Sequence, residues 1–199
     1  MKQLRLVLFL SLFALIAFSP ADPLPIGAPL PKADVKLLDV SGSQISLKEA
    51  ILENGLLVMF SCNTCPVVIE NQGRTLETGK YALAKNVGIV LLNSNEGSRG
   101  GADSFDEMKQ YAKEQGYNFH YAVDKNSELA NAFGANRTPE CFLFDKSGKL
   151  VYHGAIDDNP QDAGSVKRQH LKEAINELVS GKDVSMKKTR SIGCSIKRN

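Results

Sequence analysis

The sequence predicts an α/β fold with a mixed central β-sheet. Two apolar runs of strand length, residues 56–60 and 87–93, are hydrophobic at successive positions, which is typical of strands buried on both faces of a sheet. Helical patterning follows each run, and a strand–turn–strand pattern lies at residues 141–153. The chain has 199 residues, which is enough for one ordinary domain with a full hydrophobic core.

The first 21 residues differ in composition from the rest of the chain. Lys2 and Arg5 precede an apolar run over residues 6–18, and Ser19-Pro20-Ala21 then supplies small residues. This pattern is typical of a secretory signal peptide that is cleaved after Ala21, and the apolar run is short for a membrane span. We therefore expect a periplasmic or secreted protein without stable membrane insertion after cleavage.

Removal of this signal peptide would leave a formally neutral chain. The sequence has 24 Lys and Arg against 22 Asp and Glu, and residues 1–21 hold two of the basic residues and no acidic one, so 24 − 2 = 22 basic residues remain against 22 acidic residues. A neutral balance does not favour a broad nucleic-acid surface, so no nucleic-acid partner is expected. The basic run within residues 187–198 is expected to be a solvated tail.

The other elements are expected in a simple order. Four prolines within residues 22–32 predict an extended lead-in, and a turn at Ser41-Gly42-Ser43 predicts a β-hairpin. Strands and helices then alternate, and an amphipathic helix over residues 166–180 ends at Gly181. The predicted parts are a signal peptide (1–21), a lead-in (22–32), a domain (33–181) and a C-terminal tail (182–199).

The strongest chemical signal is Cys62-Asn63-Thr64-Cys65, directly after the first buried strand. Pro66 follows it, and proline is tolerated in the first turn of a helix because its missing N–H would have no partner there. The cysteines are therefore expected at a helix N-terminus, where unpaired N–H groups and the helix dipole stabilise a thiolate. We predict dithiol–disulfide exchange in which Cys62 attacks and Cys65 resolves, without a cofactor or a metal.

Further segments carry a resemblance to a known family. They are Ile26-Gly27-Ala28-Pro29, Thr138-Pro139-Glu140-Cys141-Phe142-Leu143-Phe144-Asp145, Gly154-Ala155-Ile156-Asp157-Asp158 and Gly193-Cys194-Ser195-Ile196-Lys197. Together with the Cys-x-x-Cys motif they resemble the thioredoxin-like superfamily, and within it the redoxin branch of secreted, peroxiredoxin-like thioredoxin-family proteins. The resemblance spans roughly residues 26–198. It implies a thioredoxin-like three-layer sandwich that is extended by an N-terminal β-hairpin of the redoxin type.

The resemblance also implies how the site is built. Pro139 would be a cis-proline facing the cysteines, Thr138 would present backbone groups to an extended substrate, and the partners would be protein disulfides and a reducing partner protein. The sequence departs from thioredoxin at Asn63-Thr64 and in having no acidic residue within the strand at 56–60. We expect the Glu140 carboxylate to lie near the thiolate and raise its pKa, which would make the protein more reducing. The residues expected to modulate the cysteine pair are therefore Asn63, Thr64, Pro66 and Glu140.

A thiol peroxidase is the first alternative function. In peroxiredoxins the attacking cysteine is followed by proline and preceded, three residues earlier, by threonine. Cys65-Pro66 fits the first half of this pattern, and Cys62 stands at the threonine position, where it would supply a resolving thiol. Arg74 or Arg137 would then have to serve as the activating cation.

A metal site is the second alternative. One Cys-x-x-Cys is half of a tetrathiolate zinc site, which Cys141 and Cys194 would complete. A copper site would use a histidine such as His120 or His153, although copper carriers of this fold have a longer cysteine spacing. Without a metal, Cys141 is expected to be a small buried strand residue. For the Gly193-Cys194 segment a structural role is favoured, while a return of Cys194 to the active site, a disulfide with another cysteine and a free thiol are left open.

Overall fold

The computed structural model describes residues 22–199, and the predicted signal peptide at residues 1–21 lies outside the described residues. Among residues 22–199, no helix combines the length and the hydrophobicity that crossing a bilayer requires. The predicted order of strands and helices is found along this part of the chain.

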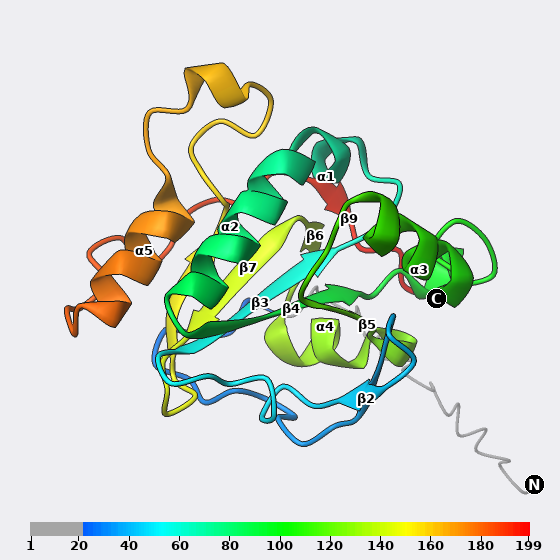
Figure 1. Ribbon diagram of the computed structural model, residues 1–199, viewed down its shortest axis with the longest axis horizontal. Helices are drawn as coiled ribbons and strands as arrows, with labels where there is room; N and C mark the ends of the chain where they lie inside the picture. The colour runs from blue at the N-terminus through cyan, green and yellow to red at the C-terminus, as the bar shows by residue number, and fades with distance from the viewer. Residues whose placement is uncertain (1–21) are drawn as a thin grey trace, which may run out of the picture.

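A seven-stranded mixed sheet lies at the centre of the molecule, with the strand order β2-β1-β5-β4-β3-β7-β8 (Figure 1). The central strands β3 and β4 are parallel, and β7 and β8 continue the sheet antiparallel to β3. The predicted N-terminal hairpin is confirmed, because β1 pairs antiparallel with β2 and adds to the sheet through β5. The strands are β1 (Leu37–Asp39), β2 (Gln44–Ile45), β3 (Gly55–Ser61), β4 (Val87–Asn93), β5 (His120–Val123), β7 (Glu140–Phe144) and β8 (Leu150–Gly154).

Five α-helices of residues 22–199 flank the sheet, and a break interrupts the helical stretch that follows the Cys-x-x-Cys motif. It falls at Asn71, where the backbone leaves the helical region, and separates α1 (Pro66–Glu70) from α2 (Gln72–Ala84). A separate two-stranded sheet joins β6 (Arg137–Thr138) to β9 (Cys194–Ser195). The other helices are α3 (Phe105–Glu114), α4 (Glu128–Phe133) and α5 (His170–Val179), with short 3₁₀ turns η1 (Glu96–Ser98), η2 (Lys125–Ser127) and η3 (Ala163–Ser165).

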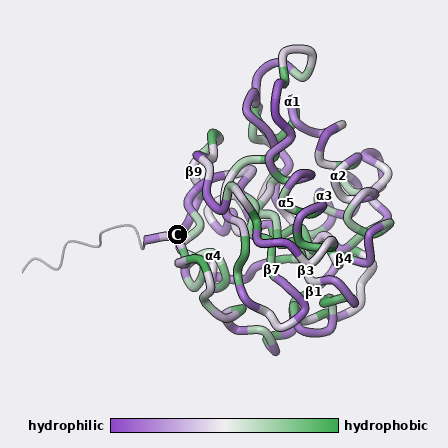
Figure 2. The backbone as a smooth tube through the Cα atoms, turned by 90° about the vertical axis from the view of Figure 1, so that its left-hand side faces the viewer, coloured by the Kyte–Doolittle hydropathy of each residue, from purple (hydrophilic) through white to green (hydrophobic). Residues whose placement is uncertain are grey.

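The core has two layers because successive side chains of a strand point to opposite faces of the sheet. On β3, Leu56, Val58 and Phe60 pack with α4 and the lead-in, whereas Leu57 and Met59 pack with α2, α3 and α5. Figure 2 shows α4 on one side of β3 and β7, and α2 and α3 on the other. The thioredoxin-like three-layer arrangement predicted from the resemblance is therefore confirmed, and burial on both faces explains the continuous apolar runs.

The basic C-terminal run keeps Lys187, Lys188, Arg190 and Lys197 exposed, as predicted, but its backbone is docked on the domain. The N–H of His153 donates to the carbonyl of Lys187, and the N–H of Thr189 donates back to the carbonyl of His153. Further on, the N–H of Ile196 donates to the carbonyl of Asn136. These are backbone hydrogen bonds, which leave no hydrophobic pattern in the sequence.

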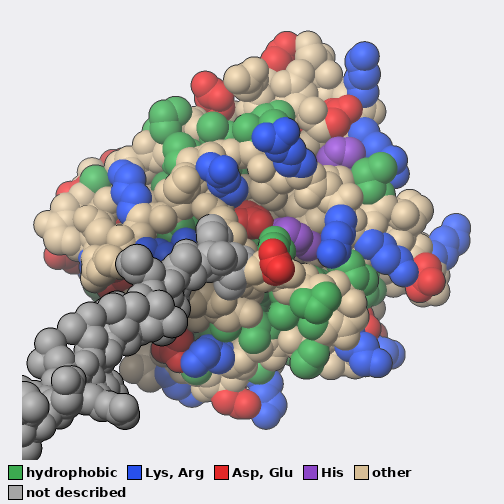
Figure 3. All heavy atoms as spheres, turned by 180° about the vertical axis from the view of Figure 1, so that it is seen from behind, with side chains coloured by type: hydrophobic (Ala, Val, Ile, Leu, Met, Phe, Trp, Pro, Cys, Tyr) green, Lys and Arg blue, Asp and Glu red, His purple; other side chains and the backbone are tan. Residues whose placement is uncertain are grey.

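On the face shown in Figure 3, Lys and Arg side chains are interspersed with Asp and Glu.

Candidate functional site

The cysteine pair follows the C-terminal end of a central strand. β3 ends at Ser61, Cys62 comes next, and Cys65 is the N-cap residue of α1, with Pro66 at the first helical position. Cys62 and Cys65 are 1% and 3% exposed, whereas Thr64 and Pro66 are exposed. The predicted placement at a helix start is therefore found, with both sulfur atoms beneath the surface.

The disulfide in the structure joins Cys65 to Cys194, 129 residues further along the chain, with their Cα atoms 5.9 Å apart. Cys62 and Cys141 are free thiols. Cys62, Cys65 and Cys194 belong to one small apolar cluster with Val67 and Val68. Three cysteines therefore meet at the site, and of the choices left open for Cys194 the structure shows the disulfide at the active site.

Thr138 contacts the cysteines through both its side chain and its backbone. Its Oγ1 lies 3.4 Å from Sγ of Cys62, and its carbonyl oxygen lies 3.3 Å from Sγ of Cys65. Thr138 also pairs with Cys194 in the β6–β9 sheet. The Thr138–Pro139 peptide bond is cis, as the resemblance implied. Thr138 is thus the residue around which the three cysteines are arranged.

Asn63, between the cysteines, is fixed by hydrogen bonds from three directions. Its backbone N–H donates to Oδ1 of Asp103 at 2.9 Å, and its Nδ2 donates to the carbonyl of Ala102 at 2.8 Å. The hydroxyl of Tyr121 donates to its Oδ1 at 2.8 Å. Asn63 is buried and its polar groups are paired, so its role in the structure is to hold the Cys-x-x-Cys loop in place.

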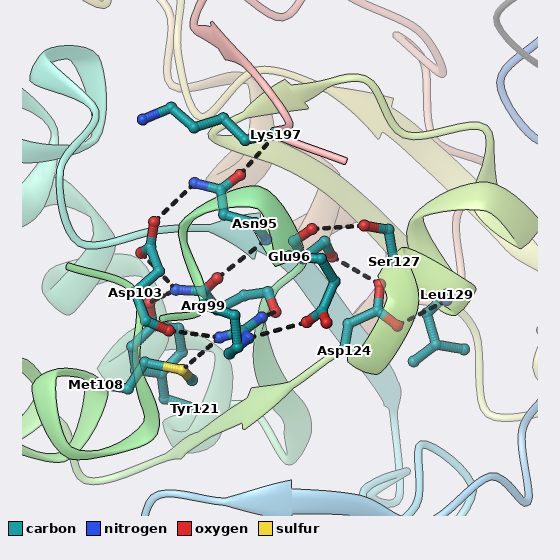
Figure 4. A network of polar contacts seen from close by, with 12 residues as sticks. Asn95, Glu96, Arg99, Asp103, Met108, Tyr121, Asp124, Ser127, Leu129 and Lys197 are labelled. Atoms are coloured by element: carbon teal, nitrogen blue, oxygen red, sulfur yellow. Dashed lines mark hydrogen bonds and ion pairs between the residues drawn. The ribbon is translucent and has the colours of Figure 1, made fainter. Parts of the chain in front are cut away.

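The Asp103 carboxylate connects this loop to the C-terminal tail. Besides the Asn63 N–H, it accepts hydrogen bonds from Nδ2 of Asn93 and Nδ2 of Asn95. Asn95 in turn accepts a hydrogen bond from the backbone N–H of Lys197 at 2.9 Å (Figure 4). Arg99 closes the network by donating to the carbonyl of Asp103. One buried acid therefore positions both the cysteine loop and the segment that carries Cys194.

The surroundings of Cys62 favour its neutral thiol. Burial is the largest cause that raises the pKa of Cys62, and the negative charge of Asp103 raises it further. The Thr138 hydroxyl and the N–H groups of Cys65 and Thr64 act in the opposite direction. The net effect is a raised pKa, so Cys62 keeps its proton to a higher pH than an ordinary cysteine.

Glu140 lies elsewhere than the sequence predicted. Its carboxylate accepts hydrogen bonds from the backbone N–H groups of Asn136 and Arg137, and it pairs with Nε2 of His153 at 2.7 Å. These bonds hold the turn before β6, and the acid that raises the pKa of Cys62 is Asp103. The prediction failed because alternate residues of a strand point to opposite faces, and closeness to Pro139 in sequence does not fix the direction of the carboxylate.

The two arginines considered for a peroxidase are engaged with other groups. Nη1 of Arg74 bonds both carboxylate oxygens of Asp157, at 2.9 and 2.8 Å, and the Arg74 side chain also donates to the carbonyls of Asn159 and Pro160. Arg137 donates to the hydroxyl of Ser195 at 3.2 Å and is exposed. Arg74 therefore fixes a loop against α2, while Arg137 braces β9.

The residues considered for a metal site do not form one, since Cys65 and Cys194 are joined in a disulfide and Cys141 lies apart in β7. Within residues 22–199, no group of three or more His, Cys, Asp and Glu side chains is arranged to hold a metal ion. Cys141 is fully buried in β7, as expected for a core residue, and burial raises the pKa of its thiol well above the ordinary range. Nε2 of His153 is paired with the Glu140 carboxylate.

Sequence reasoning missed the buried network that includes Asn93, Asn95, Asp103 and Tyr121. One signal was available, because Asn93-Ser94-Asn95 interrupts an apolar strand at its carboxyl end, where the Cys-x-x-Cys motif of the neighbouring parallel strand must also lie. Asp103 directly precedes the N-cap residue of α3. In the structure Ser104 caps α3, and its hydroxyl accepts from the N–H of Glu107.

The fold and the site together define a thioredoxin-like oxidoreductase. A Cys-x-x-Cys motif stands between a central parallel strand and a helix, beside a cis-proline, and a disulfide is formed within the site. The comparison with known families agrees with this class. The Redoxin family model matches residues 25–171, and the chain belongs to this family.

Individual relatives give the same picture. A thiol-disulfide oxidoreductase ResA of Bacillus cereus is 26% identical over 162 residues, which are 81% of each chain. A crystal structure of an uncharacterized conserved protein from Geobacillus kaustophilus is 34% identical, with a TM-score of 0.82 over 88% of this chain and 93% of that one. A hypothetical protein from Sinorhizobium meliloti is 30% identical, with a TM-score of 0.81 over 89% of this chain and 97% of that one.

Proposed function

We propose that this protein is a thiol-disulfide oxidoreductase that exchanges disulfides with extended segments of partner proteins through Cys62 and Cys65. The observation that carries the proposal is the Cys65–Cys194 disulfide, which joins a Cys-x-x-Cys cysteine to a cysteine on a strand paired with Thr138. It has the form of a mixed disulfide between the site and an extended peptide. Exchange through a mixed disulfide is the chemistry of this class.

We assign Cys62 and Cys65 the reverse of the roles expected from the sequence. Cys65 already carries the sulfur of a second segment in its disulfide with Cys194. Cys62 is a buried free thiol with a raised pKa in the same cluster. We therefore assign the bond to the partner to Cys65, and to Cys62 the attack that resolves it.

Export and a reducing partner complete the proposed function. Residues 1–21 have the pattern of a signal peptide, and disulfides persist in oxidising compartments outside the cytosol. In each cycle two electrons pass from the dithiol to a partner disulfide, so a reducing partner protein must restore the dithiol. The sequence relative named thiol-disulfide oxidoreductase supports this class of partner.

Trapping of the mixed disulfide tests the proposal. Two double variants, Cys62→Ser with Cys194→Ser and Cys65→Ser with Cys194→Ser, are mixed in reduced form with a peptide that contains one disulfide. The first variant keeps Cys65 without a resolving thiol at the site, so a stable adduct is expected. The second keeps only Cys62 at the site, and little adduct is expected from its buried thiol. Intact-mass spectrometry measures both.

The outcomes separate the function from the assignment of roles. Adduct on the second variant alone would restore the roles expected from the sequence, with Cys62 as the attacking residue. No adduct on either variant, and no oxidation of the wild-type protein by the peptide, would contradict disulfide exchange as the function. Cys141→Ala is the matched control, because this buried thiol belongs to the core and its removal should leave the adduct unchanged.

A thiol peroxidase remains the second candidate, since one observation favours it. Cys65 precedes Pro66 at a helix start and forms a disulfide with a distant cysteine, which is what a peroxidatic and a resolving cysteine would do. Arg74 is bound to Asp157, and Arg137 to the strand that carries Cys194. Neither arginine has a hydrogen bond to Cys65 among the described contacts of residues 22–199, and for this reason disulfide exchange is preferred.

A further inference from the structure

The C-terminal strand β9 occupies the backbone edge of Thr138. In the β6–β9 pair, Thr138 lies opposite Cys194 and Arg137 lies opposite Ser195, in antiparallel register. An exposed strand edge binds an extended peptide through main-chain hydrogen bonds. The chain therefore fills, with its own cysteine-bearing strand, the edge that an extended partner would use under the proposed function.

The fit of β9 depends on a close approach by glycine. A Cβ atom added to Gly193 would lie 2.1 Å from the carbonyl oxygen of Thr138, a backbone atom that cannot move away alone. Contacts within and after β9 hold it in place: the Arg137 side chain donates to the hydroxyl of Ser195, and the Lys197 N–H donates to Oδ1 of Asn95. This strand is consequently docked by specific contacts in addition to its disulfide.

The free thiol of Cys62 lies beside this disulfide. Cys62 and Cys65 both contact Thr138, at 3.4 and 3.3 Å, and both pack in the cluster that includes Cys194. A thiolate exchanges with a disulfide by attacking one of its sulfur atoms. In the disulfide form Sγ of Cys65 carries no proton, so its contact with the Thr138 carbonyl is not a hydrogen bond.

We propose that Cys194 is a third redox-active cysteine, which exchanges internally with the Cys62–Cys65 pair and thereby releases the Thr138 edge. In this step the Cys62 thiolate attacks Sγ of Cys65, the Cys65–Cys194 bond breaks, the Cys62–Cys65 bond forms, and Cys194 leaves as a thiolate. The proton lost by Cys62 is balanced by the one that Cys194 takes up. No external oxidant or reductant is needed, because one disulfide replaces another.

This exchange gives the site a closed and an open oxidised state. In the closed state β9 is linked to Cys65 and covers the edge of Thr138, and in the open state Cys194 is free and β9 is held only by its hydrogen bonds. The proposal rests on the proposed function, because the released edge is the one that an extended partner strand would occupy. The internal step itself involves no substrate and is tested without one.

Thiol labelling of the oxidised protein tests the proposal. The protein, in a Cys141→Ala background, is oxidised with one equivalent of diamide, freed of oxidant and incubated with N-ethylmaleimide without any reductant. Labelled and disulfide-linked peptides are then identified by mass spectrometry. Label on Cys194, together with a Cys62–Cys65 disulfide, is expected in the wild-type protein. In Cys62→Ser and Cys62→Ala the label on Cys194 should be lost, since the Cys65–Cys194 disulfide has no internal route of release.

The docking of β9 gives a second, independent readout. Gly193→Ala retains every cysteine of the site but places a Cβ against Thr138, so the open state and the label on Cys194 should increase. Gly100→Ala is the matched control, because a Cβ there meets open space. A protein in which diamide forms no Cys65–Cys194 disulfide before N-ethylmaleimide is added would overturn the proposal, as would Cys194 labelling that Cys62→Ser leaves unchanged. Because no partner disulfide is present, these results stand apart from the trapping experiment.

Discussion

Asp103 accepts, through Oδ1, the backbone N–H of Asn63, the residue that follows Cys62. The same carboxylate binds Asn95, which holds the backbone of Lys197 near the end of the chain. The cysteine loop and the strand that carries Cys194 are therefore fixed by one buried acid. Asp103, and not Glu140, is the acid that raises the pKa of Cys62. The two acids can be tested in parallel.

Replacement of Asp103 by Asn should lower the pKa of Cys62. The substitution removes a negative charge that raises this pKa, and it sets an amide N–H₂ against the donors of Asn93 and Asn95. The free energy of unfolding should fall by about 1–3 kcal/mol, as expected when buried donors lose their acceptor. Alkylation of Cys62 as a function of pH measures the first effect, and urea unfolding measures the second. Glu107→Gln, at an exposed position of α3, should change neither.

Replacement of Glu140 by Gln should affect stability and leave the redox properties nearly unchanged. Its carboxylate holds two backbone N–H groups and His153, so its loss should lower the free energy of unfolding by about 1–3 kcal/mol. The reduction potential of the site, measured against glutathione, should move less than in Asp103→Asn. A larger shift in Glu140→Gln than in Asp103→Asn would revive the hypothesis drawn from the sequence.

The raised pKa of Cys62 should make the protein less stable at alkaline pH. The native state keeps the Cys62 proton at pH values where the unfolded chain has already lost it. The slope of stability against pH is set by the difference in bound protons between the unfolded and native states. Stability should therefore fall as the pH rises above about 8.5, the ordinary pKa of a cysteine. Urea unfolding of the oxidised protein at several pH values tests this. Cys62→Ala should show a smaller loss, and an equal loss in both proteins would assign the effect to other groups.

Reduction of the Cys65–Cys194 disulfide should destabilise the fold. The bond closes a loop of 129 residues, and disulfides that restrict the unfolded chain in this way contribute typically about 2–4 kcal/mol. Denaturant unfolding of the wild-type protein with and without reductant measures the difference. In Cys194→Ser, reductant should lower the free energy of unfolding less, because only a Cys62–Cys65 disulfide could then be lost. An equal decrease in both proteins would contradict this assignment.

The sequence predicted the scaffold of the site well because hydrophobic periodicity and the Cys-x-x-Cys motif are local signals. The buried runs became β3 and β4, Cys65 became the N-cap of α1, and the Thr138–Pro139 bond is cis. Each of these features depends on neighbouring residues or on a motif order that resembles a known fold.

The remaining features depend on contacts between segments far apart in the chain. Asp103 reaches Asn63 from a loop 40 residues away, and Cys194 returns to Cys65 across most of the domain. The direction of the Glu140 carboxylate and the docking of the basic tail by backbone hydrogen bonds likewise leave no periodic trace in the sequence. Such long-range polar contacts had to come from the structure.

The most direct test of the central claim is the rate at which the fully reduced protein loses thiols, measured with a peptide disulfide and with hydrogen peroxide, and followed by mass spectrometry of the product. Disulfide exchange predicts fast oxidation by the peptide, with disulfides among Cys62, Cys65 and Cys194, and slow oxidation by peroxide at the rate of an ordinary thiol. Fast oxidation by stoichiometric peroxide that is abolished by Cys65→Ser, with no reaction toward the peptide, would contradict the account and identify a peroxidase.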